Sequence, residues 1–215
     1  MTRTLVIGNK NYSSWSLRAW LALRLGRVDF EQVRIALDRP QTKLEILARS
    51  PSGKVPCLID GPLVVWDSLA ICETANERYV AGILWPADAD ARAQARAVSA
   101  EMHSGFAALR THMPMDIRAH RPERGATALQ RSDVAADVAR IQSIWTDCLS
   151  SSSGPLLFGS FTIADAFYAP VVTRFRTYDV ALSPVLSAYC DAVLALPAMR
   201  EWVEAAQAET EVIDY

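Results

Sequence analysis

The chain has 215 residues, of which 51% are hydrophobic and 21% charged, a globular composition with room for one large or two small domains. The 22 Lys and Arg residues against 24 Asp and Glu residues give a formal net charge of −2, which argues against a surface built to attract nucleic acid or anionic lipid. No apolar run approaches the ~20 residues needed to cross a bilayer, and the start lacks the apolar core of a signal peptide. We therefore expect a cytoplasmic protein.

The cysteines and histidines carry no sign of a disulfide framework or a metal site. The four cysteines are far apart, lie among apolar residues and form no CxxC pair, so we expect them to be reduced. They are Cys57, Cys72, Cys148 and Cys190. The three histidines lack the spacing of metal ligands, and we expect no metal.

The first 80 residues alternate between strand-like and helix-like patterns. Residues 4–7 form a short apolar run followed by a polar stretch, 15–25 have helical periodicity, 31–37 alternate like a strand, and 43–48 fit a short helix. Two further strand-like runs, 55–59 and 63–66, flank a turn at Asp60-Gly61-Pro62 and predict a hairpin. A helix then starts at Asp67-Ser68, both good N-caps. The predicted order is βαβαββα.

The rest of the chain is rich in long helical patterns. We expect helices within 88–113, 131–149, 162–178 and 185–207, loops at 114–127 and 150–155, and no strand after Trp66. The predicted division is an α/β domain over residues 1–80, a linker at 81–87 and an all-helical domain over residues 88–215.

Hydroxyl side chains gather where the first strand leads into the first helix, in the segment YSSWSLR (12–18). Ser14 or Ser16 could simply cap the helix. Alternatively, the free N–H groups and partial positive charge of a helix start favour an anion, and a hydroxyl there can donate to a thiolate or carboxylate.

Two more segments could contribute to a site in the same βαβ/ββα unit. Pro56 begins a strand, where a trans bond is the default, and a cis bond would leave the backbone N–H and C=O of Val55 free to pair with an extended peptide. Asp67 and Ser68 begin a helix and could be caps alone. Because open sheets bind ligands at strand ends, the three segments together predict a binding site.

Four segments resemble the glutathione S-transferase family in order and spacing. They are SSWSLRAWLAL, SGKVPCLIDG, VVWDSLAICE and GSFTIADAFYAP. The most specific elements are a Val-Pro followed eleven residues later by an acid-Ser pair, and the T-x-A-D helix start. The resemblance runs over essentially the whole chain and implies a thioredoxin-like N-terminal domain followed by an all-helical domain.

The resemblance implies how this chain would bind glutathione. Lys54 would contact a carboxylate of glutathione, and Val55 would form backbone hydrogen bonds to its cysteinyl part, next to a cis Pro56. Asp67 would bind the γ-glutamyl ammonium, and Ser68 its carboxylate at the helix start. Glutathione would be a co-substrate.

By the same resemblance, Ser13 takes the place of the activating serine of the serine-type classes, with Ser14 as the rival. Members that act as thiol transferases have a cysteine there, whereas this chain has none before Cys57. Lowering a thiol pKa of ~8.5 by two units needs roughly 2.7 kcal/mol, and one hydrogen bond to a charged acceptor contributes about 1.5–3 kcal/mol. Ser13 and the helix start could therefore suffice without a metal or redox cofactor.

Thr162 and Asp165 match the family's N-capping box, with a role in folding and not in catalysis. The electrophile would lie between the two domains. Candidates on the first long helical stretch, none of them assigned to the substrate, are His103, Phe106, Arg110, His112 and Met113.

The expected function is a detoxifying transferase that adds the glutathione thiolate to a small hydrophobic electrophile, and the family resemblance implies a homodimer. One alternative is the zeta-type maleylacetoacetate isomerase. Ser13-Ser14 and Arg18 match that class, but Trp15 stands where it has cysteine and Leu17 where it has tryptophan. The other alternative is a non-catalytic binding or regulatory protein of the same fold.

Overall fold

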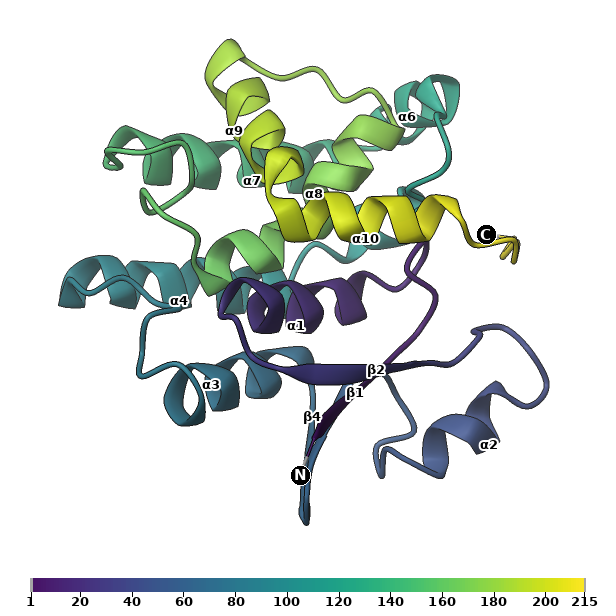
Figure 1. Cartoon of the computed structure of the whole chain (residues 1–215). Helices are drawn as coiled ribbons and strands as arrows, with labels where there is room; N and C mark the ends of the chain where they lie inside the picture. The colour runs from purple at the N-terminus through teal and green to yellow at the C-terminus, as the bar shows by residue number, and fades with distance from the viewer. Residues whose placement is uncertain (1, 215) are drawn as a thin grey trace.

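The computed structural model describes residues 2–214, and its first half contains a four-stranded sheet in the order β2-β1-β3-β4 (Figure 1). The strands are β1 (Arg3–Ile7), β2 (Phe30–Arg34), β3 (Cys57–Asp60) and β4 (Leu63–Trp66). β1 pairs in parallel with β2 and antiparallel with β3, and β3 pairs antiparallel with β4 as the predicted hairpin.

Three helices, α1 (Ser14–Leu25), α2 (Thr42–Leu47) and α3 (Ser68–Arg78), cover the two faces of this sheet. Side chains alternate across a strand, so Leu5 and Ile7 join the main core with α1 and α3, whereas Val6 joins a smaller cluster with Ile46 of α2. The predicted order βαβαββα is confirmed.

The second half is helical. Its elements are α4 (Ala89–Ser104), α5 (Ala107–His112), α6 (Pro122–Leu129), α7 (Ser132–Ser150), α8 (Ile163–Thr177), α9 (Pro184–Ala195) and α10 (Pro197–Gln207). Between residues 67 and 214 only isolated β-bridges occur, at Leu156–Gly159 and Phe158–Ser160. The predicted fold class, an α/β part followed by an all-helical part, is confirmed.

The structure divides two of the predicted helical stretches. The stretch 88–113 breaks between α4 and α5, where Phe106 adopts the left-handed conformation with φ of 59°. The stretch 185–207 breaks before Pro197, which lacks an amide hydrogen and begins α10 as an N-terminal residue.

The prediction of a loop over 114–127 is wrong for its second part, which forms α6. Pro122 lies in the first turn of this helix, a position that suits proline. Gly125 lies so close to the end of α8 that a Cβ there would be 2.0 Å from the carbonyl oxygen of Tyr178, the C-cap of that helix. The turn-forming residues Pro122 and Gly125, which favoured a loop, therefore lie inside a helix that packs closely against α8.

Two predicted strands are shorter in the structure. β2 ends at Arg34, after which the amide of Leu37 donates to Asn9 Oδ1 at 2.7 Å instead of continuing a strand ladder. β3 begins at Cys57 because Pro56 has no amide hydrogen to offer a ladder.

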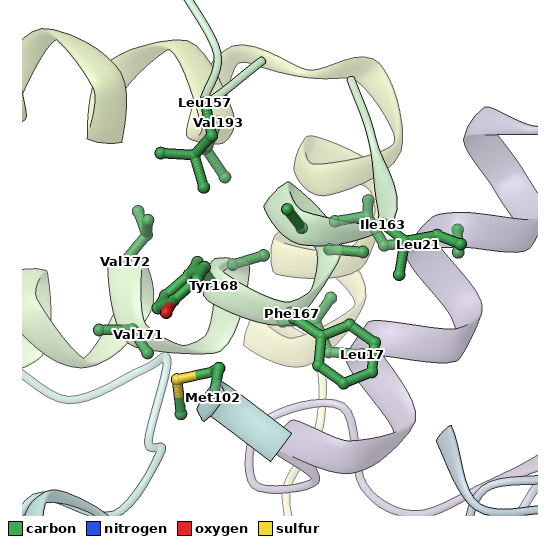
Figure 2. Packing of buried hydrophobic residues seen from close by; sticks show 14 of the residues in the cluster. Leu17, Leu21, Met102, Leu157, Ile163, Phe167, Tyr168, Val171, Val172 and Val193 are labelled. Atoms are coloured by element: carbon green, nitrogen blue, oxygen red, sulfur yellow. The ribbon is translucent and has the colours of Figure 1, made fainter. Parts of the chain in front are cut away.

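Helix α1 lies between the sheet and the second half, and its apolar side chains join the two halves into one core (Figure 1). Leu17 and Leu21 of α1 lie beside Ile163 and Phe167 of α8, and all four are fully buried (Figure 2). This junction fixes the start of α1, and with it the serine-rich segment, against the helical half.

All four cysteines are buried and free. No helix within residues 2–214 is both long and apolar enough to cross a bilayer.

Candidate functional site

Ser13 is the N-cap of α1. Its Oγ accepts a hydrogen bond from the Ser16 amide at 3.4 Å and lies 2.7 Å from the Ser16 hydroxyl. Ser16 Oγ in turn accepts from the amide of Gly8 at 3.1 Å, which joins the cap to the end of β1. The cap is thus neither Ser14 nor Ser16, the two residues that the sequence favoured, because the helix begins one residue earlier than predicted.

A cavity of about 490 Å³ opens at the ends of the strands and at the start of α3, and we call it the strand-end cavity. Its lining residues are Trp15, Ser52, Lys54, Val55, Pro56, Trp66, Asp67 and Ser68. The structure thus brings together all five residues predicted to bind glutathione. The Val55–Pro56 bond is cis, and neither the amide nor the carbonyl of Val55 has a hydrogen-bond partner within residues 2–214.

The start of α3 presents both polar side chains to this cavity. Asp67 caps the helix, with φ of 78° and with Oδ1 accepting from the Leu69 amide at 2.8 Å. Ser68 is 1% exposed, and its hydroxyl has no hydrogen-bond partner in the described part of the chain. A buried hydroxyl without a partner at a helix N-terminus suits an anionic ligand group.

His103 of α4 reaches across to Asp67, with Nε2 3.3 Å from Oδ2. Its ring contacts Trp15 edge-on, with the ring centroids 5.3 Å apart. Burial lowers the pKa of His103 below its ordinary value, although the nearby Asp67 carboxylate opposes part of this shift. Burial therefore favours the neutral form of the His103 imidazole.

A second cavity, of about 440 Å³, lies between the serine-rich segment and the helical half, and we call it the helix-side cavity. It shares Trp15, Lys54 and Val55 with the strand-end cavity and is also lined by Ser13 and Ser14. The helical half contributes Arg110, Pro114, Met115 and Arg174. Trp15 is thus a wall common to both cavities.

Two arginines contact the Trp15 ring. The guanidinium carbons of Arg18 and Arg110 lie 4.4 Å and 4.7 Å from the Trp15 ring centroid, close enough for cation–π attraction. Arg18 is 1% exposed, and its Nε and Nη1 have no hydrogen-bond partner among the described residues. Burial, and then the charges of Arg110 and Arg174, hold the pKa of Arg18 well below its usual range.

Further from the cavities, Thr162 and Asp165 form a capping box at the start of α8. The Asp165 carboxylate accepts from the Thr162 amide at 2.9 Å and from the Leu157 amide at 3.1 Å. Burial raises the pKa of Asp165 to about 6 despite these hydrogen bonds.

Family models match both halves of the chain. Residues 12–78 match the model described as glutathione S-transferase, N-terminal domain, and residues 91–205 match the C-terminal domain of the same family. The chain belongs to the glutathione S-transferase family. The α/β half of this transferase therefore has the thioredoxin-like fold, and the protein is an enzyme that uses glutathione as its co-substrate. No group of three or more His, Cys, Asp or Glu residues able to hold a metal occurs within residues 2–214.

Relatives of this transferase include zeta-class proteins. A probable maleylacetoacetate isomerase of Caenorhabditis elegans is 28% identical over 173 residues, covering 80% of this chain and 79% of the relative. A maleylpyruvate isomerase of a Ralstonia species is 28% identical over 222 residues, covering 94% and 99%. Among solved structures, a maleylpyruvate isomerase described as a bacterial zeta-class glutathione S-transferase is 27% identical, with a TM-score of 0.74 and coverage of 97% and 100%.

The structure also sorts the five electrophile-site candidates of this glutathione transferase. Arg110 lines the helix-side cavity, whereas Phe106 and Met113 are buried in the core. His103 instead faces Asp67, and His112 lines neither cavity.

Sequence reasoning missed Arg174, which lines the helix-side cavity from α8. Its signal was a basic residue inside an otherwise apolar helix, in the segment APVVTRF. Arg174 is 4% exposed, and it donates from Nε to the Met113 carbonyl at 2.9 Å.

Proposed function

We propose that the Ser13 hydroxyl donates a hydrogen bond to the thiolate of bound glutathione and so lowers its pKa. One observation carries this proposal: Ser13 lines the helix-side cavity at the start of α1, next to Trp15, which lines both cavities. A thiolate there would receive a hydroxyl hydrogen bond and the partial positive charge of the α1 N-terminus. Ser14 lines the same cavity and remains the rival.

The strand-end cavity would hold the rest of glutathione. The unpaired backbone of Val55 is available to an extended peptide, and the Lys54 ammonium to a carboxylate. The Ser68 hydroxyl and the α3 N-terminus would bind the γ-glutamyl carboxylate, and Asp67 the ammonium. The unpartnered Ser68 hydroxyl supports this arrangement most directly.

The electrophile would bind in the helix-side cavity, with the thiolate attacking an electrophilic carbon. A carbon–sulfur bond forms, and in a substitution the leaving group departs with the bonding electron pair. Pro114 and Met115 give this cavity apolar surface, while Arg110 and Arg174 give it positive charge. This lining supports a small electrophile with a hydrophobic body and an acidic group.

The two arginines also favour a second candidate, glutathione-dependent isomerisation of an unsaturated acid with two carboxylates. Addition of the thiolate to a conjugated double bond would leave an enolate whose former double bond can rotate, and elimination would return the thiolate. Relatives named maleylacetoacetate and maleylpyruvate isomerases support this reading. Trp15 and Leu17, which depart from the zeta-type motif, count against it.

Replacing Ser13 by Ala tests the activation step, with Ser14→Ala as the matched control. Bound thiolate absorbance is followed against pH, together with turnover of a reactive aryl halide. For Ser13→Ala we expect the thiol pKa to return towards its solution value of ~8.5, and turnover at pH 6.5 to fall by roughly tenfold or more. An unchanged titration with Ser13→Ala and a shifted one with Ser14→Ala would transfer the role to Ser14.

The balance of glutathione separates the two reactions. Conjugation consumes one thiol for each electrophile, whereas isomerisation returns it. Free thiol is therefore measured while maleylpyruvate or maleylacetoacetate is converted, with an aryl halide as the reference. Loss of the cis isomer at constant thiol would establish isomerisation.

We further propose that residues 1–80 bind glutathione, that 81–87 form a linker, and that 88–215 supply the electrophile site. The family-model matches over 12–78 and 91–205 support this division.

The homodimer usual in the family is testable by light scattering. The four buried free cysteines support a reducing compartment such as the cytoplasm.

A further inference from the structure

The turn that precedes Ser13 is held by residues from the helical half. The amide of Lys10 donates to Glu209 Oε1 at 2.7 Å, and its carbonyl accepts from Trp202 Nε1 at 2.9 Å. The amide of Asn11 donates to Glu209 Oε2 at 3.1 Å, and its carbonyl accepts from the Ile117 amide at 3.3 Å. All four backbone polar groups of this dipeptide thus pair with residues more than 100 positions away.

The tail after α10 carries the carboxylate that joins two of these groups, and further contacts fix the tail itself. Arg118 donates to the carbonyls of Glu209 and Glu211, and the Tyr12 hydroxyl donates to the Glu211 carbonyl at 3.4 Å. The side chain of Glu209 is 7% exposed, so its two hydrogen bonds face little competition from water.

The turn carries this restraint to Ser13 over a short distance. Both the Ser13 amide and the Tyr12 amide donate to the carbonyl of Asn9, at 2.8 Å and 3.2 Å. Asn9 is itself fixed on the other side, where its Oδ1 accepts from Leu37. A shift of the dipeptide at 10–11 therefore moves the residue that caps α1, and a hydroxyl in a hydrogen bond tolerates little misalignment.

We propose that Glu209 is a positioning residue of the transferase reaction, which orients the Ser13 hydroxyl by holding the Lys10 and Asn11 amides. The inference rests on the proposed role of Ser13. Without Glu209 two buried amides lose their acceptor, and the turn relaxes to find others. The bound thiolate then loses part of its stabilisation, while the residues lining the strand-end cavity keep their places.

The charged groups around Glu209 are few and come from three elements. Arg34 at the end of β2 lies 3.6 Å from Oε1, and Lys10 of the turn and Arg118 of the loop before α6 lie near the same tail. Arg34 also pairs with Glu211, at 2.8 Å. Glu211 is therefore a second carboxylate on the same tail that also pairs with Arg34, but it does not contact the turn at Lys10 and Asn11.

The test compares Glu209→Gln with Glu211→Gln in the full chain. Each removes one negative charge from the tail, but only Glu209→Gln turns an acceptor of the turn amides into a donor. For Glu209→Gln we expect the pKa of the bound glutathione thiol to rise by about one unit. Because the thiolate fraction then falls, kcat/KM near pH 6.5 should fall about tenfold. The KM for glutathione stays within about twofold, and above the solution thiol pKa of ~8.5 the rate approaches that of the parent enzyme.

Two results for Glu209→Gln would overturn the inference. One is a pH profile of Glu209→Gln that coincides with the profiles of the parent and of Glu211→Gln. The other is a rate that is lower by the same factor at every pH, which is what loss of folded enzyme would cause. Ser13→Ala is measured alongside. If the pKa of the bound thiol shifts in Ser13→Ala but not in Glu209→Gln, the role of Glu209 alone is rejected. If it does not shift in Ser13→Ala, the role of Ser13 is rejected, and this inference with it.

Discussion

Nε2 of His103 lies 3.3 Å from Oδ2 of Asp67, so the first long helix of the second half touches the residue that caps α3. Asp67 uses its other oxygen for the cap itself. The carboxylate proposed to bind the glutathione ammonium thus has one oxygen committed to the helix and the other beside a neutral imidazole.

The lowered pKa of His103 predicts a loss of stability in acid. Burial depresses this pKa below the ordinary histidine value of about 6.5, so the neutral form stabilises the fold above about that pH, and the contribution is lost as pH falls through the lowered pKa. Urea unfolding at pH 7.5 and 5.0 should show a larger decrease in the free energy of unfolding for the parent than for His103→Gln. Equal decreases in the two proteins would contradict the prediction.

Replacing Arg18 by Met should separate stability from activity. The buried guanidinium lacks hydrogen-bond partners at Nε and Nη1, so an apolar side chain of similar length should raise the free energy of unfolding by about 1 kcal/mol. We expect turnover of an acidic electrophile to fall, because positive charge near Arg110 and Arg174 is lost. Arg24→Met, at an exposed surface pair, should change stability by less than about 0.5 kcal/mol. The Arg18 guanidinium carbon lies 4.4 Å from the Trp15 ring centroid and 4.8 Å from that of Phe167. Destabilisation by Arg18→Met would show that these two cation–π contacts outweigh the cost of burying the charge.

Asp165 should make the fold more stable as pH falls from 7 towards 5. Its pKa of about 6 lies well above the ordinary value of an aspartate, so the folded state binds a proton in this range and the unfolded state does not. Asp165→Asn should lack this dependence in chemical denaturation. Asp165→Ala, which leaves the Thr162 and Leu157 amides without an acceptor, should lose about 3 kcal/mol at pH 7. A flat difference between parent and Asp165→Asn would mean that Asp165 titrates outside this range.

Gly125→Ala should be among the more damaging single-methyl additions. The new Cβ would lie 2.0 Å from the Tyr178 carbonyl, so α6 has to move, at a cost of about 2–3 kcal/mol. Gly82→Ala is the contrast: apart from its chain neighbours, no described residue has an atom within 4 Å of the added Cβ, but φ is +88°, and we expect a loss of about 1 kcal/mol. The melting temperatures of the two variants test the order. A smaller loss for Gly125→Ala would show that α6 shifts freely.

The sequence was sufficient for the α/β half because its elements are marked locally. Alternating apolar residues, a Gly-Pro turn and an Asp-Ser helix start each act within a few positions, and β1, β4 and α3 follow them closely. The same local signals brought the five proposed glutathione-binding residues into one cavity.

The helical half and the electrophile site were harder to predict from the sequence, because they depend on contacts between residues that are far apart in the chain. Helix α6 fits closely against Tyr178 at Gly125, a contact between residues 53 positions apart in the sequence. Arg174 reaches the helix-side cavity only because α8 packs against α1, although Arg174 and Ser13 are some 160 positions apart in the sequence. His103 was considered for the electrophile site, but its contact with Asp67 needed the placement of α4 against α3.

The pairing of Lys10 and Asn11 with Trp202 and Glu209 also sets an order of events during synthesis. The sheet half leaves the ribosome first, with the turn before Ser13 lacking four long-range hydrogen bonds. Three of them, the bonds to Trp202 and Glu209, form only once α10 and the tail have emerged and packed. A nascent or prematurely terminated chain can thus contain every residue proposed to bind glutathione while the turn before Ser13 still lacks the contacts that hold it in place.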